Sequence, residues 1–115
     1  MMLANVAVYL AVEAADLRGT FDRLAGLTRG ILQLDPNSGA LFLFVNKRRN
    51  RVKALWWDKN GYAILYKRLA RGTFVLPDLR RGRSAYVEIS AADFAQLLAG
   101  LPLPDPTSES PPVMH

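Results

Sequence analysis

Residues 41–68 read LFLFVNKRRNRVKALWWDKNGYAILYKR, and this stretch decides the fold. Three runs rich in aliphatic and aromatic residues, 41–46, 51–57 and 62–68, each have the length and composition of a β-strand. Short polar segments separate them, and the second separator ends in an Asn-Gly pair, which is typical of hairpin turns. The sequence therefore predicts three consecutive antiparallel strands, a β-meander.

The alternation of residue types within these strands assigns their side chains to two faces. If Asn46 pairs with Arg51 and Trp57 with Tyr62, one face is purely apolar: Leu41, Leu43, Val45, Val52, Ala54, Trp56, Ala63 and Leu65. The other face mixes cations with aromatic and aliphatic groups: Phe42, Phe44, Asn46, Arg51, Lys53, Leu55, Trp57, Tyr62, Ile64, Tyr66 and Arg68. A two-residue turn at Asn60-Gly61 shifts the pairing but keeps both faces. We expect a helix on the apolar face, and a mixed face that is either partly open or covered by the C-terminal strand and helix.

The segment before the meander predicts a short strand and then a long helix. Residues 5–12 are rich in Val and Tyr, which favours a strand. Asp16 is placed as a helix N-cap, and apolar residues then recur every three or four positions as far as Leu34. The cluster Asp-Pro-Asn-Ser-Gly at 35–39 predicts the turn that ends this helix.

The segment after the meander predicts two more strands and a short helix. Residues 73–76 are expected to form a weak strand, 78–83 a basic loop, and 84–89 a final strand. A capping box beginning at Ser90 opens a helix through Leu98 that Gly100 ends. We therefore expect an α+β fold with a central antiparallel meander, a long N-terminal helix packed on its apolar face and a short C-terminal helix. Residues 1–101 form a single domain, and the Pro-, Ser- and acid-rich residues 102–115 are expected to be a disordered tail.

Charge is distributed unevenly along the chain. The formal net charge is +5, but residues 47–83 hold twelve basic and two acidic residues, a net +10, so the remainder carries −5. The chain has no cysteine, and its single histidine is the last residue, which argues against disulfides, thiolate catalysis and Cys- or His-based metal sites. The apolar run of residues 1–12 follows no basic residue and is too short for a membrane span, so we expect a cytoplasmic protein with no membrane partner.

Several segments together resemble one family. They are Val-Tyr-Leu-Ala at 8–11, Phe-Asp-Arg-Leu-Ala at 21–25, Ser-Gly-Ala-Leu-Phe-Leu-Phe at 38–44, Leu-Trp-Trp-Asp at 55–58 and Leu-Tyr-Lys-Arg-Leu at 65–69. In this order the chain resembles the accessory proteins of insertion sequence 66 family transposons, called TnpB or Orf-two-like, over roughly residues 5–100. The resemblance implies an accessory role in DNA transposition beside a separate transposase, which carries the catalytic acids. It supplies no known binding residue.

The basic meander is the candidate binding surface. Lys and Arg contact phosphates, and aromatic groups beside them stack on exposed bases. The expected nucleic-acid-binding residues, three of them at the first hairpin tip, are Lys47, Arg48, Arg49, Arg51, Lys53, Lys59, Lys67 and Arg68. The expected stacking or interface residues are Trp57, Tyr62 and Tyr66, since Trp, Tyr and Arg also dominate protein interfaces. The competing interpretation is a structural protein–protein adaptor without nucleic-acid contact, its positive charge being an incidental solvated face.

The sequence offers little for catalysis. Metal-dependent nuclease chemistry needs two or three converging carboxylates, whereas Asp16 is placed as a cap and Asp35 and Asp78 as turn residues. Asp22 can pair with Arg18, four residues earlier, and Asp58 is a natural first residue of a turn. We therefore expect no enzyme activity, no catalytic residue, no metal and no cofactor. The expected partners are transposon-end DNA and the transposase of the same element; homo-oligomerisation is left open.

Overall fold

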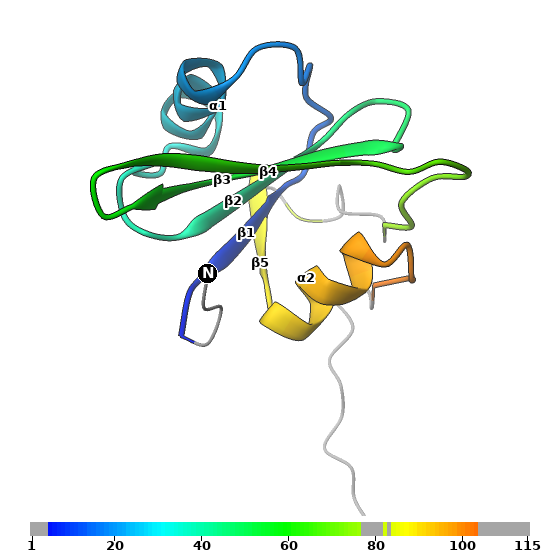
Figure 1. Cartoon of the computed structure of the whole chain (residues 1–115). Helices are drawn as coiled ribbons and strands as arrows, with labels where there is room; N and C mark the ends of the chain where they lie inside the picture. The colour runs from blue at the N-terminus through cyan, green and yellow to red at the C-terminus, as the bar shows by residue number, and fades with distance from the viewer. Residues whose placement is uncertain (1–4, 77–81, 83, 104–115) are drawn as a thin grey trace, which may run out of the picture.

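The computed structural model describes residues 5–76, 82 and 84–103, which fold around one five-stranded sheet (Figure 1). The strands are β1 (Val8–Ala11), β2 (Leu41–Val45), β3 (Arg51–Asp58), β4 (Gly61–Arg68) and β5 (Tyr86–Ile89). Their order across the sheet is β4-β3-β2-β1-β5. β1 pairs with β2 in parallel and every other neighbouring pair is antiparallel, so the sheet is mixed.

The helices are short, and the structure is mostly β. α1 (Phe21–Leu27) continues without a break into a π-helical turn, η1 (Thr28–Leu32), and α2 (Ala91–Leu98) follows the last strand. The expected fold, an antiparallel meander with a long N-terminal helix on its apolar face, is therefore wrong. The meander itself exists as β2-β3-β4, but it is part of a mixed sheet that β1 and β5 extend.

Local backbone geometry explains why the first helix is shorter than predicted. Gly19 has a φ of +91°, a conformation that an α-helix excludes, so the helix begins only at Phe21. Gln33 has a φ of +58°, in the left-handed region, and ends the helical segment at Leu32 rather than near Leu34. Asp16 lies outside the helix, where its carboxylate binds Arg18 and caps no helical N–H.

The strand register agrees with the sequence prediction. The Asn46 N–H donates to the Arg51 carbonyl at 3.1 Å, and Trp57 lies opposite Tyr62, so both predicted pairings are confirmed. The second turn places Asp58 opposite Gly61, with Lys59 at a φ of +60°. The alternative turn centred on Asn60-Gly61 does not form.

α1 lies on the mixed face of the sheet, not on the apolar face (Figure 1). The chain leaves β1, forms α1 and returns as the parallel neighbour β2, which is a β-α-β crossover. The side on which a crossover helix packs follows from the handedness of the connection and not from which face is more apolar. Leu24, Ala25 and Leu32 of the helical segment are buried with Phe42, Phe44 and Leu55, which are the apolar members at the middle of this face.

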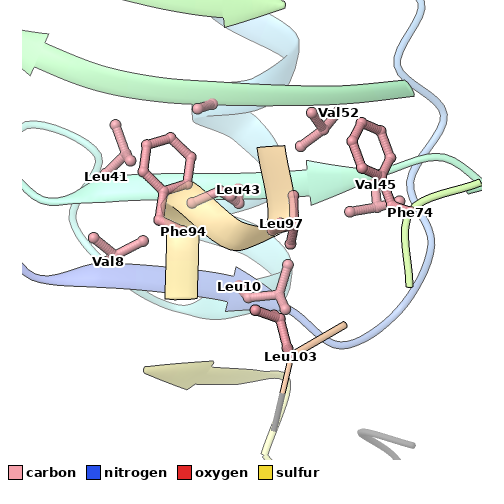
Figure 2. Close-up of a cluster of buried hydrophobic side chains, with 11 residues drawn as sticks. Val8, Leu10, Leu41, Leu43, Val45, Val52, Phe74, Phe94, Leu97 and Leu103 are labelled. Carbon is pink, nitrogen blue, oxygen red and sulfur yellow. The ribbon is translucent and has the colours of Figure 1, made fainter. Parts of the chain in front are cut away.

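The apolar face is covered by the C-terminal part of the chain. Figure 2 shows Phe94 and Leu97 of α2 over Leu41 and Leu43 of β2, beside Val8 and Leu10 of β1. The Ser90 hydroxyl accepts a hydrogen bond from the Asp93 N–H at 3.0 Å, so the predicted N-cap of this helix is confirmed. The C-terminal helix α2 thus covers the apolar face, where the N-terminal helix was expected, and α1 covers the mixed face.

The segments beside α2 differ in part from the prediction. Residues 73–76 form no strand, but Phe74 is buried in the core. The predicted strand 84–89 is present as the shorter β5, paired with β1. Most of the expected basic loop 78–83 lies outside the described residues. So does the expected tail from 104 on, whereas Leu103 is 9% exposed and packs in the core (Figure 2).

The stability of the fold should depend on β2. Leu43→Ala should lower the free energy of unfolding by about 2–5 kcal/mol, because Leu43 is fully buried in the central strand and its truncation leaves a cavity. Urea denaturation measures the change. The matched control, Ile31→Ala on the exposed side of η1, should change the free energy by less than about 0.5 kcal/mol. Equal losses of unfolding free energy in the two variants would contradict the conclusion that β2 is buried in the core on both faces of the sheet.

Candidate nucleic-acid interface

A hollow lies at one end of the sheet, between the turn that joins β2 to β3 and the loop that joins β1 to α1. Its volume is about 640 Å³. The loop is tied to the sheet because the Ala15 N–H donates to the Val45 carbonyl at 2.9 Å. The residues that line this space, here called the basic hollow, are Ala14, Ala15, Asp16, Leu17, Arg18, Gly19, Asn46, Lys47, Arg48, Arg51, Lys53 and Tyr66.

The β2–β3 turn is held in shape by Asn46. Its side-chain oxygen accepts from the N–H groups of Asn50 at 3.0 Å and Arg51 at 2.9 Å, and its amide donates to the Asn50 side chain at 2.8 Å. Its backbone carbonyl accepts from the Arg49 N–H at 2.9 Å. The turn is therefore preorganised, and the side chains of Lys47 and Arg48 are exposed.

The segment after β4 supports the back of the same turn. The Leu69 N–H donates to the Asn50 carbonyl at 2.9 Å, and the Phe74 N–H donates to the Arg49 carbonyl at 2.6 Å. Since Phe74 is itself fixed in the core, the turn is anchored to the body of the protein. Arg49 has a φ of +59° and its side chain does not line the basic hollow.

Lys53 holds the other wall of the hollow. Its ammonium donates to the backbone carbonyls of Leu17 and Gly19, both at 2.6 Å, and lies 4.8 Å from the ring centroid of Tyr66. Only 8% of the residue is exposed. The charge of Lys53 is thus compensated by carbonyl dipoles and an aromatic face, and its main effect is to fix the loop that carries Arg18.

Arg18 is a wall residue that the sequence interpretation did not select. Its guanidinium forms two hydrogen bonds of 3.0 Å and one of 2.7 Å with the Asp16 carboxylate. Hydrogen bonds from the Arg18 side chain and backbone hold the pKa of Asp16 well below its usual range, and the same carboxylate raises the pKa of Arg18. Nothing in the local sequence signals that this loop meets residues 46–51.

The basic hollow carries a strong positive charge. Five basic residues and one acidic residue line it, which gives a net charge of +4. A concave surface with one sign of charge concentrates counter-ions of the other sign, so the hollow attracts anions. Among the expected binding residues, Lys47, Arg48, Arg51, Lys53 and Tyr66 line it, and Arg68 lies beside them as the cross-strand partner of Arg51.

The other expected site residues lie elsewhere. Lys67 donates to the Leu98 carbonyl at 2.5 Å, at the C-terminal end of α2, where a cation is favourable. Trp57, Tyr62 and Lys59 belong to the opposite end of β3 and β4, about 20 Å from Arg51 at the rise of an extended strand. Trp57 packs edge-to-face on Tyr62 with ring centroids 5.0 Å apart, and the Tyr62 hydroxyl donates to the Asn37 side chain. Of the eleven predicted residues, six thus lie in or beside the basic hollow and three lie at the opposite end of β3 and β4. The other two, Lys67 and Arg49, belong to neither group.

Residues 5–76, 82 and 84–103 contain neither a candidate metal site nor a candidate membrane span. No group of three or more His, Cys, Asp or Glu side chains gathers there in a way that would hold a metal ion. Within residues 5–76, 82 and 84–103, no helix has the length and apolarity needed to cross a membrane.

The comparisons with known proteins point to one family. The family model described as IS66 Orf2-like protein matches residues 6–108. Two proteins of Sinorhizobium fredii (strain NBRC 101917 / NGR234) are similar over most of their length. The uncharacterized protein y4hO is 37% identical over 97 residues, covering 84% of this chain and 82% of the relative. The uncharacterized protein y4jC is 31% identical over 94 residues, covering 82% and 78%. No solved structure matches the chain.

The role of Lys53 in holding the loop can be tested directly. Lys53→Met should lower the free energy of unfolding by about 1–3 kcal/mol, because two carbonyls lose a charged donor. It should also speed amide hydrogen exchange in residues 14–19. Lys59→Met, at the exposed far turn, serves as the control and should do neither. Unchanged exchange in residues 14–19 of the Lys53 variant would show that the loop does not depend on this contact.

Proposed function

Because the chain belongs to the IS66 Orf2-like protein family, we propose that it is a non-catalytic accessory protein of DNA transposition that contacts transposon DNA through the basic hollow. Family membership links the chain to transposition by insertion sequences. We add three points to this link: the protein contacts DNA, it does so through the basic hollow, and it does not catalyse a reaction. A protein that handles DNA works where the DNA is, so the proposal places it in the cytoplasm.

The main support for the proposal is that two segments far apart in the sequence together form one positive surface. Arg18 comes from the β1–α1 loop, and Lys47, Arg48 and Arg51 come from the β2–β3 hairpin. All four side chains are exposed, and the turn and loop that carry them are fixed by backbone hydrogen bonds. Phosphate groups are the anions for which such preorganised Lys and Arg clusters are suited, since each neutralised phosphate also releases counterions.

The acidic residues support a binding role over a catalytic one. Asp16 is engaged by Arg18, and Asp35 accepts a hydrogen bond from the Asn37 N–H at 2.9 Å within a turn. Asp93 lies in the first turn of α2, on the other side of the sheet from the hollow. Among the residues that the structure describes, Asp16 is the one carboxylate lining the hollow, whereas two-metal phosphoryl chemistry requires several. The proposal therefore needs no metal and no cofactor.

DNA binding should depend on salt and on the hairpin cations. Labelled transposon-end DNA should bind at 50 mM salt, and affinity should fall steeply by 200 mM. Lys47→Ala/Arg48→Ala should weaken binding at least tenfold and reduce the slope of log affinity against log salt by about 2, because each lost phosphate contact removes nearly one unit. Fluorescence anisotropy measures both quantities.

The chain offers a charge-matched control for this experiment. Arg29→Ala/Lys59→Ala also removes one Lys and one Arg, both exposed and both away from the basic hollow, and should reduce affinity far less. The proposed contact surface is refuted if the two double variants behave alike, or if DNA is not bound at 50 mM salt.

A second candidate function is docking on the transposase of the same element, and the open edge of β4 favours it. β4 is the last strand of the sheet on its side and is eight residues long. Asp58 and Gly61 flank a two-residue turn, and in such a hairpin the flanking residues form a hydrogen-bonded pair. Along the two strands, hydrogen-bonded pairs then alternate with pairs whose N–H and C=O groups point outward. The N–H and C=O groups of Tyr62, Ile64, Tyr66 and Arg68 therefore point away from β3. An edge of this kind accepts an extended segment of a partner protein as a further strand.

The adaptor function can be tested by removing one outward N–H. Ile64→Pro deletes a donor on the open side without breaking a hydrogen bond to β3, so co-purification with the transposase should fall sharply. Ile64→Ala removes the same side-chain packing but keeps the N–H, and should retain the transposase. If wild-type protein and transposase do not retain each other, or if both variants lose the partner equally, docking through this edge is excluded.

A further inference from the structure

We propose that the basic hollow receives an unpaired nucleotide, so that single-stranded DNA, and not duplex DNA, is its preferred ligand. This inference rests on the proposed function and names the form of nucleic acid that the same surface takes.

The shape of the hollow favours an unpaired nucleotide over a duplex. The basic hollow is a concave space of about 640 Å³ between two projecting segments, which is the size of a small-ligand pocket. In a duplex the bases are stacked and paired inside the helix, and only their edges are accessible in the grooves. A duplex lying across the hairpin would contact Lys47 and Arg48 and leave the space behind them empty. An unpaired nucleotide can place its base in that space.

Apolar groups of Ala14, Ala15, Leu17 and Tyr66 line the hollow together with the cations. A site that recognised phosphate alone would gain nothing from this apolar surface. A nucleotide presents an apolar, aromatic base beside an anionic phosphate, so it matches both parts of the lining. Single-strand binding proteins combine the same two features, a positively charged track and an aromatic platform.

Tyr66 offers a ring on which a base can stack. The Lys53 ammonium lies against its ring at 4.8 Å from the centroid, and Arg51 donates to its hydroxyl at 3.2 Å, so two cations hold the ring in place. Tyr66 nevertheless remains 51% exposed. The ammonium occupies one face of the ring, so a base would stack on the other face, at little entropic cost because the ring is already held.

Exposed cations lie on two sides of the hollow. Lys47 and Arg48 are on the hairpin side and Arg18 is on the loop side, where Asp16 fixes its guanidinium. A strand that places one base against Tyr66 has a phosphate before and a phosphate after that nucleotide. Cations on both sides match this arrangement.

Charge alone predicts the opposite preference, which makes the inference testable. Duplex DNA has the higher charge density, and its binding releases more counterions for each phosphate neutralised. A purely electrostatic surface should therefore bind duplex at least as tightly as single strands. Tighter binding of single strands would therefore show that the shape and lining of the hollow, and not charge alone, determine the preference.

The experiment compares one fluorescein-labelled 12-nucleotide DNA, free and annealed to its complement, in anisotropy titrations with the full chain at 100 mM salt. We expect the single strand to bind at least about tenfold more tightly than the duplex. Tyr66→Leu should weaken single-strand binding about tenfold and leave duplex binding unchanged, because stacking on an aromatic ring is lost. Tyr66→Phe keeps the ring and its contact with Lys53 but loses the hydrogen bond from Arg51, so it should lose much less affinity than Tyr66→Leu. Thermal unfolding checks that each variant is folded.

The outcomes separate this inference from the function on which it rests. Equal or tighter binding of the duplex, with Tyr66→Leu harmless, overturns the inference and leaves DNA binding by the hairpin intact. Equal losses with Tyr66→Leu and Tyr66→Phe overturn the stacking role of the ring. Failure of both DNAs to bind wild-type protein at 50 mM salt overturns the proposed function together with the inference.

Discussion

Burial of β2 on both faces is the constraint from which the rest of the structure follows. All five residues from Leu41 to Val45 are buried, so each face of the sheet must be covered by a separate part of the chain. α1 and its π-helical extension cover one face, and α2 with Phe74 and Leu103 covers the other. β2 must also have a neighbour on each side, and β1 supplies the second one by parallel pairing.

The parallel pairing of β1 with β2 has a direct consequence for the candidate site. A parallel pair requires the chain to cross from one end of the sheet to the other between the two strands. β1 and β2 therefore end on the same side, and the loop that leaves β1 lies beside the turn that leaves β2. Lys53, inside the sheet, holds that loop through the carbonyls of Leu17 and Gly19. The basic hollow is thus a product of the topology, and a simple meander would not have produced it.

The features that the sequence predicted correctly are local ones. Alternation between Leu41 and Arg68 was enough to predict register and faces, and Ser90 followed by Asp93 was enough to predict the start of α2. The features that it did not predict depend on contacts between distant residues. Four residues of β1 do not show which strand they will pair with, and the carbonyls that receive Lys53 lie 36 and 34 positions away. The place of Arg18 in the hollow depends on such distant contacts too. Alternation assigns Trp57 and Tyr62 to the same face as the cations, but it does not show that they lie at the opposite end of the strands.

The central claim is that the β1–α1 loop and the β2–β3 hairpin act together as the DNA contact surface. Amide chemical shifts of isotope-labelled protein, followed by NMR during titration with a short DNA, test it most directly. We expect the shift changes to concentrate in residues 14–19 and 46–53 and at Tyr66, and to occur in both segments at the same DNA concentrations. Shift changes confined to the hairpin, or centred on Trp57 to Tyr62 at the other end of the sheet, would contradict it.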